Sequence, residues 1–213
     1  MLTIHHLGKS QSERIVWLCE ELDVPYRLER HARDPVTMLA PPALTALHPM
    51  GAAPVIVDGE LVLAESGAIV SYIIGVHGGG RLAYGPYHPD FAAYLYWLNF
   101  ANGNLQPVMG RSMLLRRAEL PADHPVRLAQ QGRLERAFAQ VETRLGAADY
   151  LAGGELTAAD IMTVFSLSTM RHFTPVDLAP YPNIRAYLQR IAARPAYRRA
   201  MQAGDPDMPP LLT

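Results

Sequence analysis

Two serines, Ser10 and Ser12, stand just before an apolar segment, where a hydroxyl group could stabilise a negative charge. Ser10 and Glu13 have the Ser-x-x-Glu spacing of a capping box, in which both side chains cap the first turn of a helix. Ser12 is a second candidate cap. Free N–H groups and the positive end of the helix dipole also favour an anion at this position, including a thiolate. Capping and anion binding are compatible, so both serines are candidate binding groups.

Two further clusters, Ala53-Pro54 and Glu65-Ser66, flank an apolar stretch. A proline at the head of a strand usually marks only the first position of that strand. A cis peptide bond would instead turn the N–H and C=O groups of Ala53 outward, where they could pair with an extended ligand. Glu65 and Ser66 are typical of a first helical turn, or else Ser66 holds a carboxylate and Glu65 an ammonium group. The second interpretation describes a site for the zwitterionic end of an amino acid.

The spacing of apolar residues predicts the elements that must position these clusters. Asp58-Gly59 favours a tight hairpin turn, because this pair accepts positive φ angles. The elements expected in chain order are a strand over 2–7, a helix over 10–22, a strand over 24–28, an irregular stretch with one helical turn over 35–49, a hairpin over 54–63 and a helix over 68–74. This order suits a small sheet covered by helices.

Glycine and proline concentrate in the stretch 79–89, which is the expected linker between a first domain, 1–78, and a second, 90–213. No strand pattern follows the linker, so the expected fold class is an α/β domain followed by an all-α domain. The helical candidates of the second domain are 91–119, 125–145, 158–172 and 183–194. The first of these should bend or break, because it contains Gly103, Pro107 and Gly110.

Composition excludes several classes of function. The 213 residues carry a formal net charge of −1, which provides no basic field for nucleic acid. The single cysteine, Cys19, excludes an internal disulfide and a cysteine-based zinc site, and its apolar neighbours indicate a core residue. His5 and His6 are not expected to share a metal ion, because neighbours on a strand point to opposite faces. With no membrane-length apolar run and no signal-peptide pattern, a cytoplasmic protein without a membrane partner is expected.

The three clusters in this order resemble those of the cytosolic glutathione transferases, and the resemblance covers nearly the whole chain. The segment APVIVDGELVLAESGAIVSYI is similar to the glutathione-binding segment of the family, and HHLGKSQSERIVWLCEEL is similar to bacterial and fungal members. LTAADI resembles the family's capping motif, with Thr157 as the cap and Asp160 at the third helical position. YPNIRAYLQRIAARPAY resembles the late helix of the family and its Arg-Pro terminator. The resemblance implies a thioredoxin-like domain, a helical bundle and a homodimer.

The resemblance also implies that glutathione is the co-substrate and that its thiolate attacks a small hydrophobic electrophile. In serine-type members the catalytic hydroxyl lies a few residues before the helix arginine that matches Arg14, which favours Ser10 and leaves Ser12 as the alternative. The hydroxyl would donate to the sulfur and so stabilise the thiolate.

The remaining site residues are implied in the same way. Ala53 and a cis Pro54 would pair with the cysteinyl backbone of glutathione, and Glu65 with Ser66 would hold its γ-glutamyl group. On the family's geometry, the residues that could line the acceptor site are Phe100, Asn102, Met109 and Arg111.

The chain departs from the family pattern at two positions. Ala52 stands where many relatives have a Lys, Arg or Gln that holds the glycine carboxylate of glutathione. His48 or Lys9 could take over this role, or both are ordinary solvated residues. Asn102 stands where an acidic residue is expected. Two alternatives are a glutathione-dependent peroxidase that uses the same site and a non-catalytic binding or regulatory protein. Thiol–disulfide exchange by the protein's own cysteine is not expected, since the first strand–helix turn lacks the Cys-x-x-Cys motif.

Overall fold

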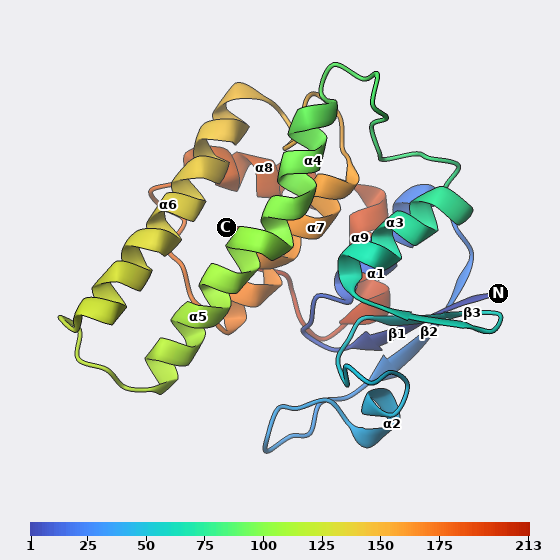
Figure 1. The fold of residues 1–213 in the computed structure, drawn as a ribbon, viewed down its shortest axis with the longest axis horizontal. Coiled ribbons are helices and arrows are strands. Elements are labelled where there is room, and N and C mark those ends of the chain that lie inside the picture. Colours follow the sequence, from blue (N-terminus) through green and yellow to red (C-terminus); the bar gives the residue numbers. More distant parts are fainter. The chain divides into compact units, whose positions relative to one another are not determined.

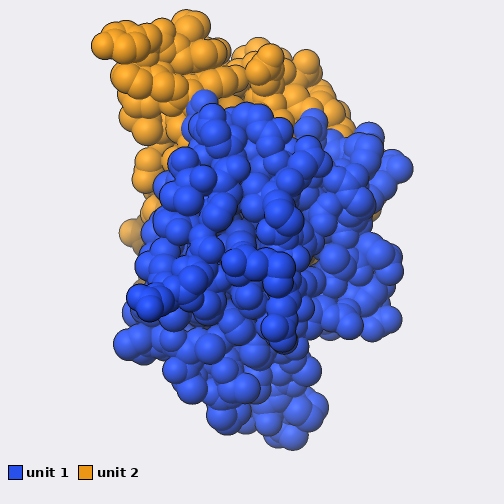
Figure 2. All heavy atoms as spheres, turned by 90° about the vertical axis from the view of Figure 1, so that its right-hand side faces the viewer, with its two compact units in different colours: residues 1–83, 192–210 blue, residues 84–191, 211–213 orange.

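The computed structural model describes residues 1–213, which contacts divide into two compact units. The first unit comprises residues 1–83 and 192–210, and the second comprises 84–191 and 211–213 (Figure 2). This division differs from the expected one, in which all of 90–213 belonged to the helical domain. The last helix packs with the first unit instead, so the chain returns to its N-terminal part near its end.

The first unit is built on a four-stranded sheet with the order β2-β1-β3-β4 (Figure 1). β1 runs parallel to β2 and antiparallel to β3, and β3 is antiparallel to β4. The four strands are β1 (Leu2–Leu7), β2 (Tyr26–His31), β3 (Val55–Asp58) and β4 (Leu61–Ala64). Gly59 has φ +61° in the connection between β3 and β4, which confirms the hairpin predicted at Asp58-Gly59. This mixed sheet with its helices is the expected thioredoxin-like arrangement.

Two helices of the first unit, α1 (Glu13–Leu22) and α3 (Ser66–Val76), pack against each other and against the sheet. Nearly the whole of α1 is buried, which explains its apolar sequence. The short helix α2 (Pro42–Thr45) is the single helical turn expected in the irregular stretch. Its Leu44 joins Leu7 and Ala53 in a small apolar cluster. The ends of β1 and β3 that carry the candidate site are therefore fixed by packing.

Helix α9 (Pro195–Gly204) differs from the prediction, in which the Arg194-Pro195 pair only ends a helix. The preceding helix ends at Ala192, and Pro195 then begins a new one, since proline is well suited to the first helical position. α9 packs on α1, where Arg194 forms an ion pair of 2.6 Å with Glu21. Arg199 adds a second one of 2.6 Å with Glu20. The two ion pairs attach α9 to α1, and the last residue of α9, Gly204, lies next to the His6 ring on β1.

The second unit is entirely helical, which confirms the expected fold class (Figure 1). The long segment predicted to bend contains a π-helical segment, Ala101–Leu105, at the position of Gly103. The helices of this unit are α4 (Phe91–Phe100), α5 (Gln106–Arg117), α6 (Pro125–Ala147), α7 (Ala158–Leu167) and α8 (Pro182–Ala192), with a 3₁₀ turn at Thr169–His172. Among all the helices of the chain, none has the length and apolar character needed to cross a bilayer.

The start of α7 is fixed by the capping box predicted from LTAADI. The Thr157 side chain accepts from the first turn, and Asp160 accepts from the backbone N–H of Thr157 at 2.9 Å. Asp160 also accepts from the N–H of Leu151 at 2.9 Å and from the hydroxyl of Tyr187 at 3.0 Å. Burial raises the pKa of the Asp160 carboxyl, and these hydrogen bonds oppose the rise. The motif therefore stabilises the helical unit.

Candidate functional site

Gln11, in the loop before α1, and Arg14, on α1, join the three clusters that the sequence singled out. The Gln11 amide donates to the carbonyl oxygen of Ala53 at 3.2 Å, and the Ala53–Pro54 peptide bond is cis. Arg14 donates through Nη1 to Gln11 Oε1 at 3.0 Å and to Ser66 Oγ at 3.2 Å. The loop before α1, the cis-proline turn and the start of α3 therefore form one continuous network. Sequence reasoning did not foresee Gln11 and Arg14 as its connectors.

Arg14 is a fully buried cation within the network. Burial lowers the pKa of its guanidinium to about 9, and the nearby carboxylates of Glu13 and Glu65 oppose this decrease. The group is therefore positively charged at neutral pH. An arginine within the otherwise apolar face of a predicted helix was the signal that could have identified it, because buried cations are rare unless they are paired.

Glu65 and Ser66 differ in exposure. Glu65 is exposed, whereas Ser66 is 1% exposed and is the first residue of α3. Glu65 has φ +74°, a left-handed conformation that L residues rarely adopt and that costs about 1–3 kcal/mol. Such strain is concentrated at functional sites, where surrounding contacts maintain it.

Ser10 and Ser12 have different surroundings. Ser10 is 7% exposed, and its Oγ accepts from the backbone N–H of Ser12 at 3.2 Å, next to the start of α1 at Glu13. Ser12 is 0% exposed, and its hydroxyl lies 2.9 Å from His6 Nδ1 and 3.1 Å from the N–H of Leu7, which donates to it. Ser10 therefore caps the turn that leads into α1, whereas Ser12 faces β1.

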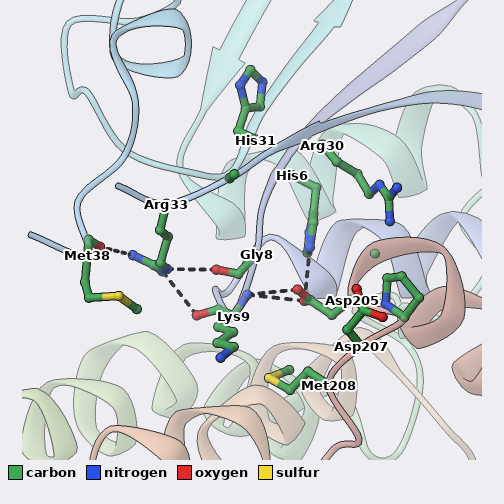
Figure 3. A pocket seen from close by; sticks show the side chains of 13 residues that line it. His6, Gly8, Lys9, Arg30, His31, Arg33, Met38, Asp205, Asp207 and Met208 are labelled. Atoms are coloured by element: carbon green, nitrogen blue, oxygen red, sulfur yellow. Dashed lines mark hydrogen bonds and ion pairs between the residues drawn. The ribbon is translucent and has the colours of Figure 1, made fainter. Parts of the chain in front are cut away.

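Two residues that the sequence did not single out as functional complete this region. His6 is buried on β1, and its Nε2 lies 3.1 Å from Oδ2 of Asp205, which follows α9. Figure 3 shows the His6 ring directed at Asp205, which also accepts from the backbone N–H of Lys9 at 3.1 Å. Asp205 thus fixes both a β1 side chain and the turn just before Ser10.

The four residues expected at an acceptor site all lie in the helical unit, and the structure brings only two of them to one cavity. Phe100 and Arg111 border a cavity of about 320 Å³, which Arg133 and Arg136 also line. Met109 is fully buried, and its carbonyl accepts from Thr174 at 3.2 Å. Asn102 lies half-buried on the π-helical segment and does not line this cavity.

The remaining residues that the sequence analysis considered are one cysteine, two histidines and one lysine. Cys19 is fully buried, and burial raises the pKa of its thiol to about 12, which agrees with a core residue. His5 lies 3.1 Å from His31, on the opposite side of β1 from the contacts of His6. His48 accepts through Nδ1 from the N–H of Met50 at 3.2 Å, and the side chain of Lys9 is exposed.

The geometry suits an extended ligand with an anionic end. The N-termini of α1 and α3 present N–H groups, a hydroxyl stands at each, and the exposed Glu65 carboxylate can accept an ammonium group. All these groups belong to the first unit.

Comparisons with known proteins agree with this fold. Residues 10–74 match the family "Glutathione S-transferase, N-terminal domain", and residues 83–195 match "Glutathione S-transferase, C-terminal domain". Glutathione S-transferase 3 of Schizosaccharomyces pombe is 30% identical over 218 residues, which cover 95% of this chain and 87% of that protein. A solved glutathione S-transferase from Actinobacillus pleuropneumoniae has a TM-score of 0.88 and 32% identity, covering 96% of this chain and 93% of that one.

A family member from Pseudomonas fluorescens, solved with two glutathione molecules bound, shares the fold. Its TM-score is 0.79 at 22% identity, covering 94% of this chain and 92% of that one. The two family matches and the fold similarity thus indicate the same family. The chain belongs to the glutathione S-transferase family.

Proposed function

We propose that this glutathione transferase conjugates the thiolate of glutathione to a small hydrophobic electrophile and that the Ser10 hydroxyl stabilises the thiolate. The observation that carries the proposal is the Gln11–Arg14 network, which joins the Ser10 loop to Ala53 and Ser66. These are the groups an extended tripeptide needs along its length. Glutathione found in a structural neighbour supports the choice of co-substrate.

In the proposed complex, Ala53 and Pro54 present the backbone to the cysteinyl unit, while Glu65 and Ser66 hold the ammonium and carboxylate of the γ-glutamyl group. The charged Arg14 behind Ser66 favours a carboxylate there. Ala52 has no polar side chain and so cannot hold the glycine carboxylate of glutathione. His48 and Lys9 are the candidates for that role.

The chemistry follows from the position of Ser10 before α1. A hydrogen bond from its hydroxyl and the positive end of α1 both favour thiolate over thiol. Lowering a thiol pKa from near 8.5 by roughly two units corresponds to about 2.7 kcal/mol, which these two interactions can supply. The sulfur then forms a bond to an electrophilic carbon, and the leaving group departs with its electron pair.

The choice of Ser10 over Ser12 is supported by exposure. Ser12 is fully enclosed and its oxygen already contacts His6 and Leu7, whereas Ser10 keeps a small exposed surface. For the acceptor site we propose Phe100 and Arg111 as lining residues of the helical unit. Met109 and Asn102 do not border this cavity and are not part of the proposed lining.

We also propose a cytoplasmic homodimer. The edge strand β4 leaves the side chains of Leu61 and Val62 exposed by 37% and 40%, which is apolar surface that a second subunit could cover. Sedimentation should then give twice the chain mass of 23.5 kDa. A mass of one chain at micromolar concentration would contradict the dimer.

Calorimetric titration with glutathione tests the function, together with the ultraviolet absorbance of the bound thiolate as a function of pH. We expect the wild type to bind and to form thiolate below the ordinary thiol pKa, and we expect this pKa to rise in Ser10→Ala. Turnover of an aryl halide beside a hydroperoxide then separates conjugation from peroxidase activity. Absence of binding at millimolar glutathione would overturn the enzyme assignment and favour the non-catalytic alternative.

A further inference from the structure

An unbroken chain of hydrogen-bonding groups leads away from Ser10. Ser10 Oγ lies 2.7 Å from Ser12 Oγ, Ser12 Oγ lies 2.9 Å from His6 Nδ1, and His6 Nε2 lies 3.1 Å from Asp205 Oδ2. Ser12 and His6 are both 0% exposed, and the Asp205 side chain is 11% exposed. The proposed thiolate-binding hydroxyl is thus linked to a histidine–carboxylate pair that solvent barely reaches.

The Asp205 carboxylate, the last acceptor in this series of hydrogen bonds, determines which group donates in each of them. An ionised carboxylate can only accept, so His6 Nε2 carries a hydrogen that it donates to Asp205. If the ring is neutral, Nδ1 must accept, and the hydroxyl of Ser12 donates to it. Ser12 Oγ then accepts from Ser10, so the hydrogen of Ser10 is directed toward Ser12 and away from a bound sulfur.

Protonation of His6 reverses every donor in the chain. The imidazolium donates from Nδ1 to Ser12, and Ser12 donates to Ser10 at 2.7 Å in preference to its longer contact with the carbonyl oxygen of Leu7 at 3.3 Å. The hydroxyl hydrogen of Ser10 is then available for the thiolate. The orientation that stabilises a thiolate is therefore the one in which His6 carries an additional proton.

We propose that His6 receives the thiol proton of bound glutathione through the hydroxyls of Ser10 and Ser12. The S–H bond breaks, each hydroxyl passes on its own hydrogen as it accepts the next, and an N–H bond forms at His6 Nδ1. The electron pair stays on sulfur, and Asp205 stays ionised and balances the imidazolium. This inference rests on the proposed function, in which glutathione binds beside Ser10.

The surroundings of His6 suit a cation. Its ring lies against the C-terminal residue of α9, Gly204, where an added Cβ would stand 3.2 Å from both Cε1 and Nε2. The C-terminus of a helix carries the negative end of the helix dipole. Burial raises the pKa of Asp205, but the hydrogen bonds from His6 and from the N–H of Lys9 outweigh burial, so the pKa lies below its ordinary value.

Other charged groups near His6 partly oppose one another. Arg30 is the register partner of His6 on β2. Lys9, Arg33 and Asp207 line the cavity of about 620 Å³ that His6 and Asp205 border (Figure 3). Arg33 is directed away from His6 by its hydrogen bonds to the carbonyls of Gly8, Lys9 and Met38. Arg30 and Lys9 therefore disfavour an imidazolium, while Asp205, in direct contact, and Asp207 favour it.

Counting protons tests the proposal on the wild type without any substitution. Thiolate absorbance gives the number of thiolates formed when glutathione binds, and calorimetry in buffers of different ionisation enthalpy gives the protons released. We expect fewer than one proton released per thiolate at neutral pH, where nearly all free glutathione still carries its thiol proton. Release of a full proton per thiolate at neutral pH would overturn the proposal.

Two substitutions then locate the retained proton. In His6→Gln we expect the pKa of the bound thiol to rise, with about tenfold less thiolate at neutral pH per unit of rise, and one proton released per thiolate that still forms. Asp205→Asn should shift the pH profile of kcat in the same direction, with little change in the KM for glutathione. Asp207→Asn is the matched comparison: it removes a carboxylate from the same cavity without breaking a hydrogen bond to His6, so its shift should be clearly smaller than that of Asp205→Asn.

A merely structural role for His6 would lower activity equally at all pH values and leave the thiol pKa unchanged, which would contradict the proposal. If the wild type forms thiolate that is lost in Ser10→Ala but unchanged in His6→Gln, only this proposal fails. If the wild type forms no thiolate, the proposed function and this inference both fail.

Discussion

Arg14 and Ser66 are joined by a hydrogen bond of 3.2 Å, although they stand 52 positions apart in the sequence. The contact ties a buried residue of α1 to the first residue of α3. Because Gln11 extends the same network to Ala53, one guanidinium group links the loop before α1 to α3 and, through Gln11, to the cis-proline turn.

Replacing Arg14 should therefore destabilise the first unit. In Arg14→Met, the acceptors on Gln11 and Ser66 lose a charged donor in a buried site, and we expect unfolding free energy to fall by about 3 kcal/mol. Urea denaturation measures the loss. Arg117→Met, at an exposed position on α5, is the control and should change stability by less than about 0.5 kcal/mol. Equal effects in the two variants would show that the network contributes nothing.

The γ-glutamyl end of glutathione should depend on Glu65 and Ser66. Loss of a hydrogen bond to a charged group costs about 1.5–3 kcal/mol, so Ser66→Ala and Glu65→Gln should each weaken glutathione binding by roughly 10- to 100-fold. Cysteinylglycine lacks this end of the molecule, and its binding should not change. Glu60→Gln in the β3–β4 turn is the control. A parallel loss of affinity for both ligands would place the effect elsewhere.

The capping box of α7 should affect folding and not ligand affinity. Asp160→Ala leaves the N–H groups of Leu151 and Thr157 and the hydroxyl of Tyr187 without their acceptor, which should cost roughly 3 kcal/mol. Thermal unfolding should show a lower Tm, while the folded fraction binds glutathione with an unchanged Kd. Asp149→Ala removes an exposed ion pair with Arg190 and should cost less than about 1 kcal/mol.

The carboxylate of Asp205 should give a pH-dependent contribution to stability. Because its pKa is lowered in the folded protein, this contribution is complete above the unfolded pKa of about 3.9 and is lost as pH falls through the folded pKa. The difference in unfolding free energy between wild type and Asp205→Asn should therefore be largest near neutral pH and shrink below pH ~4. A difference that stays constant with pH would mean that the charge of Asp205 does not stabilise the fold.

Local patterns in the sequence predicted much of the fold correctly. The β3–β4 hairpin follows from Asp58-Gly59, and the capping box follows from Thr157 and Asp160, because each depends on residues only a few positions apart. The same local reasoning missed α9. A proline that ends one helix and a proline that begins the next look alike until the burial of the following residues is known.

The sequence alone predicted the fold class, most of the elements and the chemical groups of the site, because turns, caps and apolar stripes are encoded by neighbouring residues. Only the tertiary structure decided that Ser12 is enclosed while Ser10 keeps an exposed surface. It also brought His6 to Asp205, which lies 199 positions away. Such pairings arise from the packing of α9 against α1 and the sheet, and packing depends on what the whole chain buries and not on any local spacing.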